Sequence, residues 1–215
     1  MKIFIPIKEN SQRVKRKNFR KINNNSLYNH MLYKLSNFEV YVDTDSDEIF
    51  QDINKNEKLN NVTVFKRSSD LIGDRVSVCD LIKNFIEKFN FYDNIIFQTH
   101  VTSPFLTNEI ILDSKKCMQG NIDSVVSCNV INSRFWRKEN YGFVPVNHNP
   151  LKLEQTQDLP NYYEENSVFY IFKGSNFIKN KSRIGMFPYF FPLDFPFNID
   201  IDTESDWNLV ESITK

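Results

Sequence analysis

The chain has 215 residues, of which 40% are hydrophobic, and its 27 basic side chains balance its 27 acidic ones. A chain of this length buries a full core as one α/β domain over residues 1–215, and its balanced charge argues against a general attraction to nucleic acid or to a membrane surface. Its three widely spaced cysteines lack CxxC spacing and fit a reducing compartment, so we expect a cytoplasmic protein.

Short β-branched and aromatic runs alternate with stretches of helical spacing through the first 130 residues. The runs predict strands at 2–7, 39–45, 61–65, 93–102, 123–130 and, later in the chain, 166–172. The helical stretches are 26–35, 46–53, 77–89 and 107–118, with Ser77 and Thr107 as expected caps. Such alternation predicts βαβ units on a parallel sheet.

After residue 130 the alternation gives way to a stretch rich in Pro, Asn and aromatic residues. We expect an excursion over 130–165 that closes a site or joins a second subunit. The most apolar late stretch, 186–197, contains prolines and Asp194, which predicts a loop or an edge and argues against a membrane-spanning helix.

A basic loop follows the first predicted strand. Residues 8–21 contain Lys8, Arg13, Lys15, Arg16, Lys17, Arg20 and Lys21. Because α/β sheets bind ligands at the carboxyl ends of their strands, such a cluster suits a triphosphate. The alternatives are a solvated basic loop and a contact with a nucleic-acid backbone.

Two aspartates lie near the end of the chain. Asp200 and Asp202 are alternate residues of a segment that is predicted to be extended, so their carboxylates point to the same side. Two hard oxygen ligands suit Mg²⁺, which completes its shell with water and phosphate oxygens. The alternative is a strand end followed by a helix cap from Thr203 or Glu204.

Both ends of the chain resemble the sialic acid (acylneuraminate) and Kdo cytidylyltransferases. IPIKENSQRVKRKN (5–18) is similar to the first strand and loop of that family, and IDIDTESDW (199–207) to its near-terminal IDIDT-x-x-D motif. Segments 42–49, 65–78, 99–107 and 154–172 resemble family segments in the same order. The resemblance therefore extends over nearly the whole chain.

The resemblance implies a fold and a set of site residues. The fold is a Rossmann-like, mostly parallel α/β sheet flanked by helices, of the nucleotide-diphospho-sugar transferase type, with the excursion around 130–165. The implied catalytic residues are Lys8, Lys17 and Asp202, and Asp200 and Asp202 are implied to hold Mg²⁺. The other implied residues bind the nucleotide (Ser11, Arg13, Asn18, Arg67 and Ser77) or the sugar (His100, Thr102, Gln157 and Asn166).

Four positions depart from the family pattern. Lys8, Leu106 and Glu165 stand where family members carry Arg, and His100 stands at a Gln position. Lys8 keeps the positive charge but lacks the bidentate fork of an Arg. A lone His at a strand end is also typical of packing or of a polar network, so His100 is expected to bind rather than to catalyse.

The implied activity is the transfer of CMP from CTP to an acidic nonulosonic sugar of the sialic, legionaminic or pseudaminic acid type, with release of pyrophosphate. The implied partners are CTP, the sugar and a second copy of the chain in a homodimer. The alternatives are another NTP-dependent sugar nucleotidyltransferase and a nucleotide-binding relative that has lost catalysis. A nucleic-acid-binding module would depend on KRKNFRK (15–21) alone.

Overall fold

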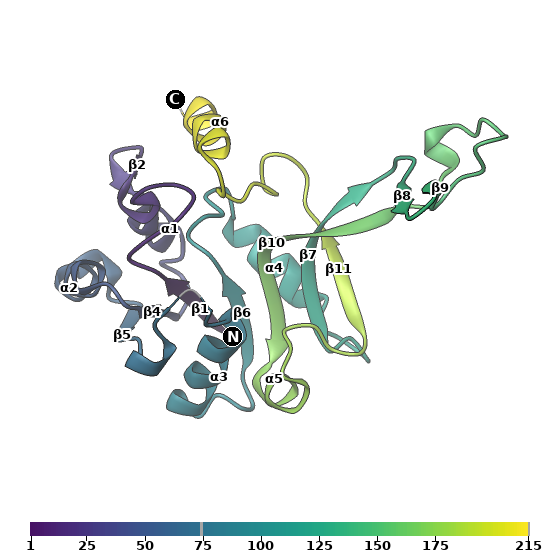
Figure 1. The fold of residues 1–215 in the computed structure, drawn as a ribbon. Helices are drawn as coiled ribbons and strands as arrows, with labels where there is room; N and C mark the ends of the chain where they lie inside the picture. The colour runs from purple at the N-terminus through teal and green to yellow at the C-terminus, as the bar shows by residue number, and fades with distance from the viewer. Residues whose placement is uncertain (74, 215) are drawn as a thin grey trace.

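A seven-stranded sheet in the order β11-β7-β10-β6-β1-β4-β5 forms the centre of the molecule (Figure 1). The computed structural model describes residues 1–73 and 75–214. The strands are β1 (Lys2–Ile7), β4 (Val40–Thr44), β5 (Val62–Lys66), β6 (Ile95–Thr99), β7 (Ser124–Ile131), β10 (Tyr162–Lys173) and β11 (Pro188–Pro192). All neighbouring pairs are parallel except those of β10, which runs antiparallel to β6 and β7. The predicted mostly parallel α/β sheet is confirmed.

Helices cover both faces of this sheet. They are α1 (Leu27–Lys34), α2 (Asp47–Lys55), α3 (Val78–Phe89), α4 (Asn108–Lys116), α5 (Gly174–Asn180) and α6 (Glu204–Thr214). One core cluster packs α1, α2 and α4 against Ile3, Ile5 and Ile7 of β1, and the other packs α3 and α5 against Phe4. Because both faces of β1 are buried, its sequence is a continuous apolar run without alternation.

Helices α3 and α4 begin at the side-chain caps that the sequence predicts. Ser77 and Asp80 form a capping box at the start of α3, and Thr107 accepts a hydrogen bond from the backbone N–H of Ile110 at the start of α4. Each cap satisfies backbone donors that have no partner within the helix. Within the described ranges 1–73 and 75–214, no helix combines the length and the apolar character that spanning a membrane requires.

The excursion forms an arm that leaves the sheet. The N-terminal half of β10 and the C-terminal end of β7 extend into it, and the hairpin of β8 (Trp136–Glu139) and β9 (Gly142–Pro145) lies at its far end (Figure 1). Residues 188–192, within the stretch expected to be a loop or an edge, form the edge strand β11.

The end of the chain returns to its beginning. Trp207 and Val210 of α6 share a buried cluster with Ile22 and Leu27, which follow the basic loop. The Arg20 guanidinium lies 4.2 Å from the centre of the Trp207 ring and pairs with Glu204 at 2.6 Å. This packing brings the segment before α6 over the carboxyl ends of β1 and β6.

Candidate functional site

A cavity of about 280 Å³ lies at the carboxyl ends of β1 and β6. Its lining comes from the basic loop, the end of β6, strand β10 and the segment before α6. The lining residues are Pro6, Lys8, Ser11, Arg13, Lys17, Asn18, His100, Val101, Thr102, Ser167, Asp200 and Asp202. An adjoining cavity of about 240 Å³ shares Lys8, Ser11, Arg13 and Lys17 and adds Asn10 and Gln12. Most residues proposed from the sequence therefore meet here.

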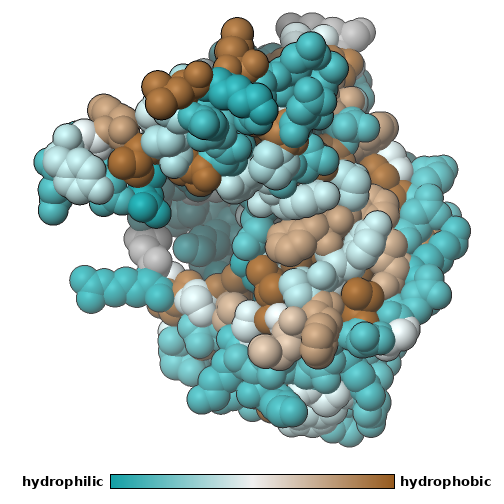
Figure 2. Space-filling view, turned by 90° about the vertical axis from the view of Figure 1, so that its right-hand side faces the viewer, coloured by the Kyte–Doolittle hydropathy of each residue, from teal (hydrophilic) through white to brown (hydrophobic). Residues whose placement is uncertain are grey.

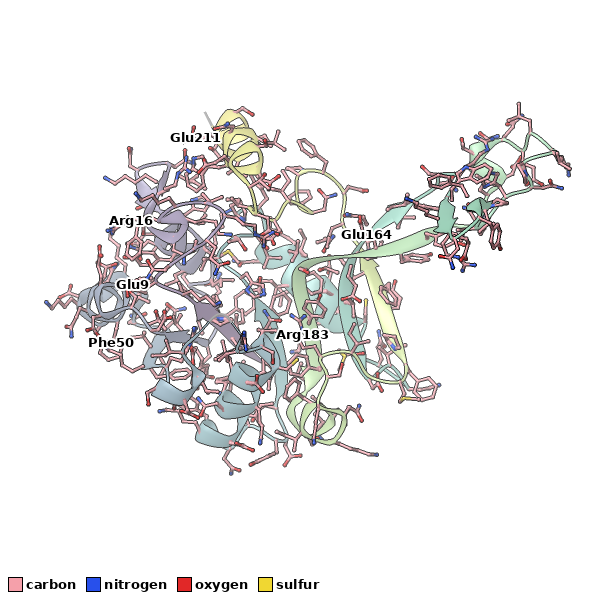
Figure 3. The ribbon with its side chains drawn as sticks, viewed as in Figure 1. Glu9, Arg16, Phe50, Glu164, Arg183 and Glu211 are labelled. Carbon is pink, nitrogen blue, oxygen red and sulfur yellow. The ribbon has the colours of Figure 1, made fainter. Side chains whose placement is uncertain are left out.

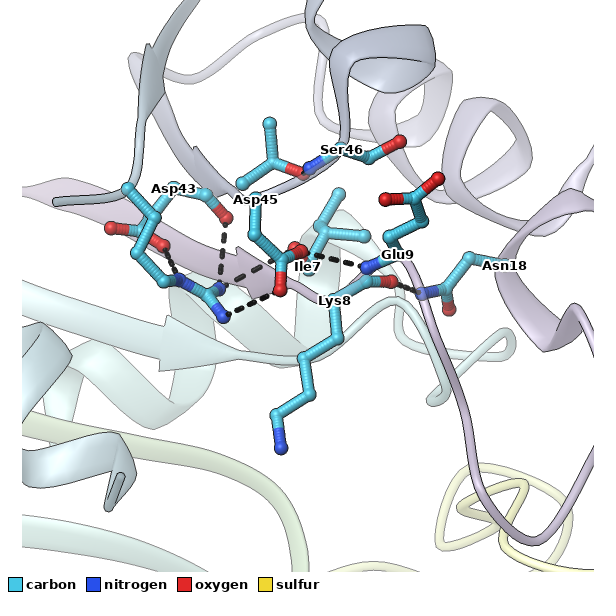
Figure 4. Close-up of polar contacts among 9 residues, drawn as sticks. Ile7, Lys8, Glu9, Asn18, Asp43, Asp45 and Ser46 are labelled. Atoms are coloured by element: carbon cyan, nitrogen blue, oxygen red, sulfur yellow. Dashed lines mark hydrogen bonds and ion pairs between the residues drawn. The ribbon is translucent and has the colours of Figure 1, made fainter. Parts of the chain in front are cut away.

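Two hydrogen bonds fix the backbone around Lys8 (Figure 4). The side-chain amide of Asn18 donates to the carbonyl oxygen of Lys8 at 2.6 Å, and the N–H of Glu9 donates to Asp45 Oδ1 at 2.7 Å. The Lys8 side chain points away from both contacts. Lys8 thus begins the basic loop from a fixed position at the end of β1.

Arg67 lies beneath this loop and does not line the cavity in the part of the chain that the structure describes. Its side chain is 1% exposed and forms an ion pair with the fully buried Asp43, and its Nη1 lies 3.6 Å from Asp45 Oδ2. Its Nη2 also donates to the carbonyl oxygen of Ile7 at 3.4 Å. Arg67 therefore supports the end of β1 and the carboxylate that holds Glu9.

Three other expected binding residues also lie outside the cavity lining. Ser77 caps α3 and lines a separate cavity of about 390 Å³ between α3 and α5. Gln157 is exposed on the arm and donates to Gln155 at 2.7 Å. Asn166 donates to Asn129 at 3.1 Å, one residue before Ser167, which does line the cavity.

The acidic segment is docked on the end of β6. The backbone N–H of Ile201 donates to the carbonyl oxygen of Thr102 at 2.8 Å, and the Lys17 ammonium donates to the carbonyl oxygen of Ile201. Asp202 Oδ1 lies 2.8 Å from Arg13 and 3.8 Å from Lys17. Burial lowers the pKa of Lys17, and the carboxylates of Asp200 and Asp202 oppose that shift.

Asp200 has a buried carboxylate oxygen without a partner. Its Oδ1 is buried and makes no hydrogen bond to any residue that the structure describes. Burial, and then the neighbouring Asp202 carboxylate, raise the pKa of Asp200 to about 6, although a hydrogen bond from Thr102 acts in the opposite direction. A buried anionic oxygen without a donor is unfavourable unless a cation or proton compensates it.

This pair of carboxylates fits a hard divalent cation. Asp200 and Asp202 both line the cavity and offer only oxygen atoms. Over residues 1–73 and 75–214, no group of three or more His, Cys, Asp or Glu side chains is placed to hold a metal. A cation held by Asp200 and Asp202 would therefore complete its shell with water or substrate oxygens, as Mg²⁺ commonly does.

The helix cap considered as the alternative to a metal site is also present and comes from Thr203, so it does not use the carboxylates of Asp200 and Asp202. The Asp206 carboxylate accepts hydrogen bonds from the N–H groups of Asp202 and Thr203, at 3.0 and 2.7 Å. Thr203 Oγ1 in turn accepts from the N–H of Asp206 at 3.3 Å. The cap thus fixes the backbone of Asp202 and leaves its carboxylate in the cavity wall.

Ser167 is a lining residue that the sequence interpretation missed. It has a φ of 61° in the left-handed region, where the pairing of β10 with β7 shifts register between Glu165 and Tyr170. β-Bulges and strained non-glycine residues are each enriched next to functional sites. No sequence pattern marked the bulge, because it depends on how two distant strands pair.

The arrangement suits a polyanion held beside a metal-bound hydroxyl or phosphate. Lys8, Arg13 and Lys17 supply positive charge on one side of the cavity, and Asp200 and Asp202 supply oxygen ligands on the other. Ser11 and Asn18 add short polar side chains to the loop. Positioning and charge neutralisation are the main requirements of phosphoryl and nucleotidyl transfer.

Comparison with known proteins gives similar sequences and folds. "Post-translational flagellin modification protein B" of Campylobacter coli is 24% identical over 220 residues, covering 95% of this chain and 91% of that protein. "CMP-N,N'-diacetyllegionaminic acid synthase" of Campylobacter jejuni is 26% identical over 212 residues, covering 94% and 89%.

Two solved structures share the fold. A CMP:2-keto-3-deoxy-manno-octonic acid synthetase complexed with CTP has a TM-score of 0.68 at 14% identity, covering 98% of this chain and 96% of that one. A 4-diphosphocytidyl-2C-methyl-D-erythritol synthase has a TM-score of 0.67 at 12% identity, covering 100% and 98%. The family model for cytidylyltransferases matches residues 3–209. The chain therefore belongs to the cytidylyltransferase family.

Proposed function

We propose that this protein transfers CMP from CTP to an acidic nonulosonic sugar and releases pyrophosphate, with Mg²⁺ held by Asp200 and Asp202. The observation that carries the proposal is the meeting, in one cavity, of three basic residues from the start of the chain and two carboxylates from its end. The C. jejuni relative, whose name records synthesis of a CMP derivative of an acidic sugar, supports this substrate class.

In the proposed reaction the anomeric hydroxyl of the sugar attacks the α-phosphorus of CTP. A bond forms between the sugar oxygen and the α-phosphorus, the hydroxyl proton passes to water, and the bond from that phosphorus to the oxygen bridging to the β-phosphate breaks, so that pyrophosphate leaves with the bridging oxygen. Bound Mg²⁺ would supply Lewis acidity that lowers the pKa of the hydroxyl. Lys8, Arg13 and Lys17 neutralise charge on the phosphates, and the Lys17 ammonium also holds the carbonyl oxygen of Ile201.

The surroundings of Asp200 and Asp202 indicate which of the two carboxylates would interact more strongly with a bound cation. One buried oxygen of Asp200 has no hydrogen-bond partner among the described residues, whereas the Asp202 side chain is 42% exposed and is paired with Arg13. Asp200 would therefore gain most from a bound cation. Asp202 would hold the same cation while it remains beside Arg13 and Lys17 of the basic loop.

The test is pyrophosphate release with CTP and Mg²⁺ against a panel of neuraminic, legionaminic, pseudaminic and Kdo sugars, with ATP, GTP and UTP as nucleotide controls. We expect release with CTP and one acidic sugar only. Release with a neutral sugar phosphate, or with another nucleotide, would contradict the proposal. CTP binding without any release would indicate a relative that has lost catalysis.

A matched pair of variants tests the metal site. Asp202→Asn is expected to lower turnover on the order of 100-fold or more, because it removes an anionic oxygen ligand of the proposed Mg²⁺, and with the cation its stabilisation of the charge on the transition state. Asp194→Asn, an exposed position on the same C-terminal segment, should retain wild-type turnover. Near wild-type turnover in Asp202→Asn would overturn the assignment of this carboxylate.

We further propose that the protein is a cytoplasmic homodimer joined through the arm. Support for the dimer comes from large apolar side chains that the arm exposes to solvent, among them Tyr141, Phe143, Leu151 and Leu153. The side of the molecule that bears the arm carries further hydrophobic residues beside a deep hollow (Figure 2). The three free cysteines support a reducing compartment.

A further inference from the structure

A chain of hydrogen bonds leads from Arg183 to the cavity. Arg183 follows α5 and lies beside β10 (Figure 3). Its Nη1 donates to Gln98 Oε1 at 2.8 Å, and its guanidinium lies 3.7 Å from the centre of the Tyr170 ring. The amide nitrogen of Gln98 lies 2.9 Å from Nε2 of His100, which lines the cavity.

Two partners fix the orientation of the Gln98 amide. An Arg has only donors, so the atom that faces Arg183 must be the amide oxygen. The other end of the amide lies 3.2 Å from the carbonyl oxygen of Thr99, which only accepts, so that end must be the NH₂ group. Gln98 is fully buried, and both contacts require the same orientation.

The orientation of Gln98 decides the tautomer of His100. Because the Gln98 NH₂ group donates to Nε2, that nitrogen must accept and carries no proton. In a neutral imidazole the proton is then on Nδ1. Burial, and then the positive charges of Arg183 and Lys17, lower the pKa of His100 to about 4, so the ring is neutral near pH 7.

We infer that Arg183 and Gln98 are positioning residues that hold His100 as a fixed Nδ1–H donor for an oxygen acceptor of the sugar substrate. The nature of that acceptor rests on the proposed function, whereas the tautomer does not. A Gln at this position, as in the resembled family, presents either a donor or an acceptor. His100 in this setting presents a donor only, which favours a carboxylate, carbonyl or ether oxygen over a group that must donate.

The surroundings of Arg183 explain why it keeps this orientation. Its guanidinium stacks on Tyr170, and the Tyr170 hydroxyl donates to Glu165 at 3.0 Å. Glu165 is the residue that stands where family members carry Arg. Arg183 is therefore linked to Glu165 through Tyr170, and to the cavity through the hydrogen bonds of Gln98 and His100.

Nitrogen-15 NMR of histidine-labelled protein tests the tautomer without any substrate. The chain has three histidines, so the His100→Gln variant assigns the His100 ring. At pH 7 we expect the shift pattern of a neutral ring protonated on Nδ1. A wild-type ring protonated on Nε2, or on both nitrogens, would overturn the inference.

Variants of the two positioning residues test the cause. Gln98→Glu offers His100 only acceptor oxygens, so the ring is expected to gain a proton on Nε2, while Arg183 retains a partner. Arg183→Met is expected to give a mixture of tautomers, and Arg183→Lys, which keeps a donor, should restore most of the Nδ1–H pattern. An unchanged tautomer in both Gln98→Glu and Arg183→Met would refute the role of this hydrogen-bond chain.

Kinetics test the specificity role. Arg183→Met is expected to raise the KM for the sugar about three- to tenfold, because only the fraction of His100 rings protonated on Nδ1 can donate to it, and to change the KM for CTP by less than about twofold. Lys181→Met, at a nearby exposed cation, should change neither. Equal effects on both substrates would contradict the role in sugar recognition.

The two readouts separate this inference from the proposed function. Absent turnover with every acidic sugar, together with an intact Nδ1–H pattern, would reject the proposed function and retain the positioning of His100. An active enzyme with a different His100 tautomer would retain the proposed function and reject the positioning of His100.

Discussion

Arg67, which the sequence suggests for nucleotide binding, lies in a buried supporting position. Its guanidinium is enclosed by Asp43, Asp45 and the carbonyl oxygen of Ile7. Asp45 in turn accepts the N–H of Glu9, next to Lys8. The ion pair of Arg67 with Asp45 and the hydrogen bond of Asp45 with Glu9 therefore link Arg67 to the loop that lines the cavity, without placing Arg67 in the lining.

Removal of Arg67 should destabilise the whole protein. In Arg67→Met the buried Asp43 carboxylate loses its partner, and breaking a buried pair in this way costs about 3–5 kcal/mol. Urea unfolding, followed by circular dichroism, measures the loss. The control is Arg16→Met, which breaks a surface pair with Glu48 and should cost less than about 1 kcal/mol. An equal, small loss in both variants, with weakened CTP binding only in Arg67→Met, would instead favour a direct nucleotide contact.

His100 should make the stability depend on pH in a defined window. Its pKa is about 4 in the folded protein, below the ordinary value of 6.5. Between these two values the unfolded chain binds a proton that the folded protein does not, so stability falls as the pH is lowered from 6.5 to 4. The expected contribution is roughly 3 kcal/mol, and it is fully lost below pH 4.

The difference between wild type and His100→Gln isolates this contribution from those of other titrating groups. Free energies of unfolding are measured from pH 4 to 7.5 for both proteins. The wild-type curve should approach or cross the variant curve as the pH falls. A difference that does not change over this range would show that His100 titrates normally in the folded state.

At the scale of elements, local sequence patterns predicted the strands and helix starts that depend only on residues nearby in the sequence. The β-branched runs predicted β1, β4 and β5 within one or two residues of their ends, and Ser77 with Asp80 predicted the start of α3. These features depend on side-chain burial and on backbone donors within one turn. The sequence therefore contains enough information to fix them.

Features that depend on distant pairing were not predicted. The β8–β9 hairpin and helix α5 were missed, α6 was foreseen only through a possible helix cap at Thr203 or Glu204, and β10 is longer than the expected 166–172. Ser167 enters the cavity only because β10 shifts its register against β7. The hydrogen bond from Arg183 to Gln98 joins residues 85 positions apart, so no local sequence pattern could predict it.

The candidate site also contains residues that could be predicted from the sequence and residues that could not. Residues at the ends of β1 and β6 and in the acidic segment were predicted to meet, because the carboxyl ends of parallel strands lie at one edge of a sheet. Gln157 and Ser77 were assigned by resemblance to segments that, in this chain, fold onto the arm and onto the start of α3. Their positions depend on the tertiary packing of those segments.

At the scale of the whole molecule, the two ends of the chain pack together, and the arm from the middle of the chain projects away from the sheet. The packing of Trp207 against Ile22 and Leu27 completes the cavity, whereas the arm packs little against the rest of the protomer. Leu151 and Leu153 on the arm are 95% and 91% exposed. Side chains of this kind gain free energy when a partner covers them.

Substitution of these two leucines should therefore separate the proposed dimer without unfolding the protomer. The double variant Leu151→Lys with Leu153→Lys removes apolar burial worth roughly 1.5–3 kcal/mol per side chain, so the dimer dissociation constant should rise on the order of 100-fold or more. Sedimentation equilibrium measures it, and urea unfolding checks that each protomer keeps its stability. Leu112→Lys on α4, 48% exposed and outside the arm, is the control and should leave the dimer intact. A wild-type protein that sediments as a monomer, or a double variant that dimerises as tightly as wild type, would show that this part of the arm joins no second copy.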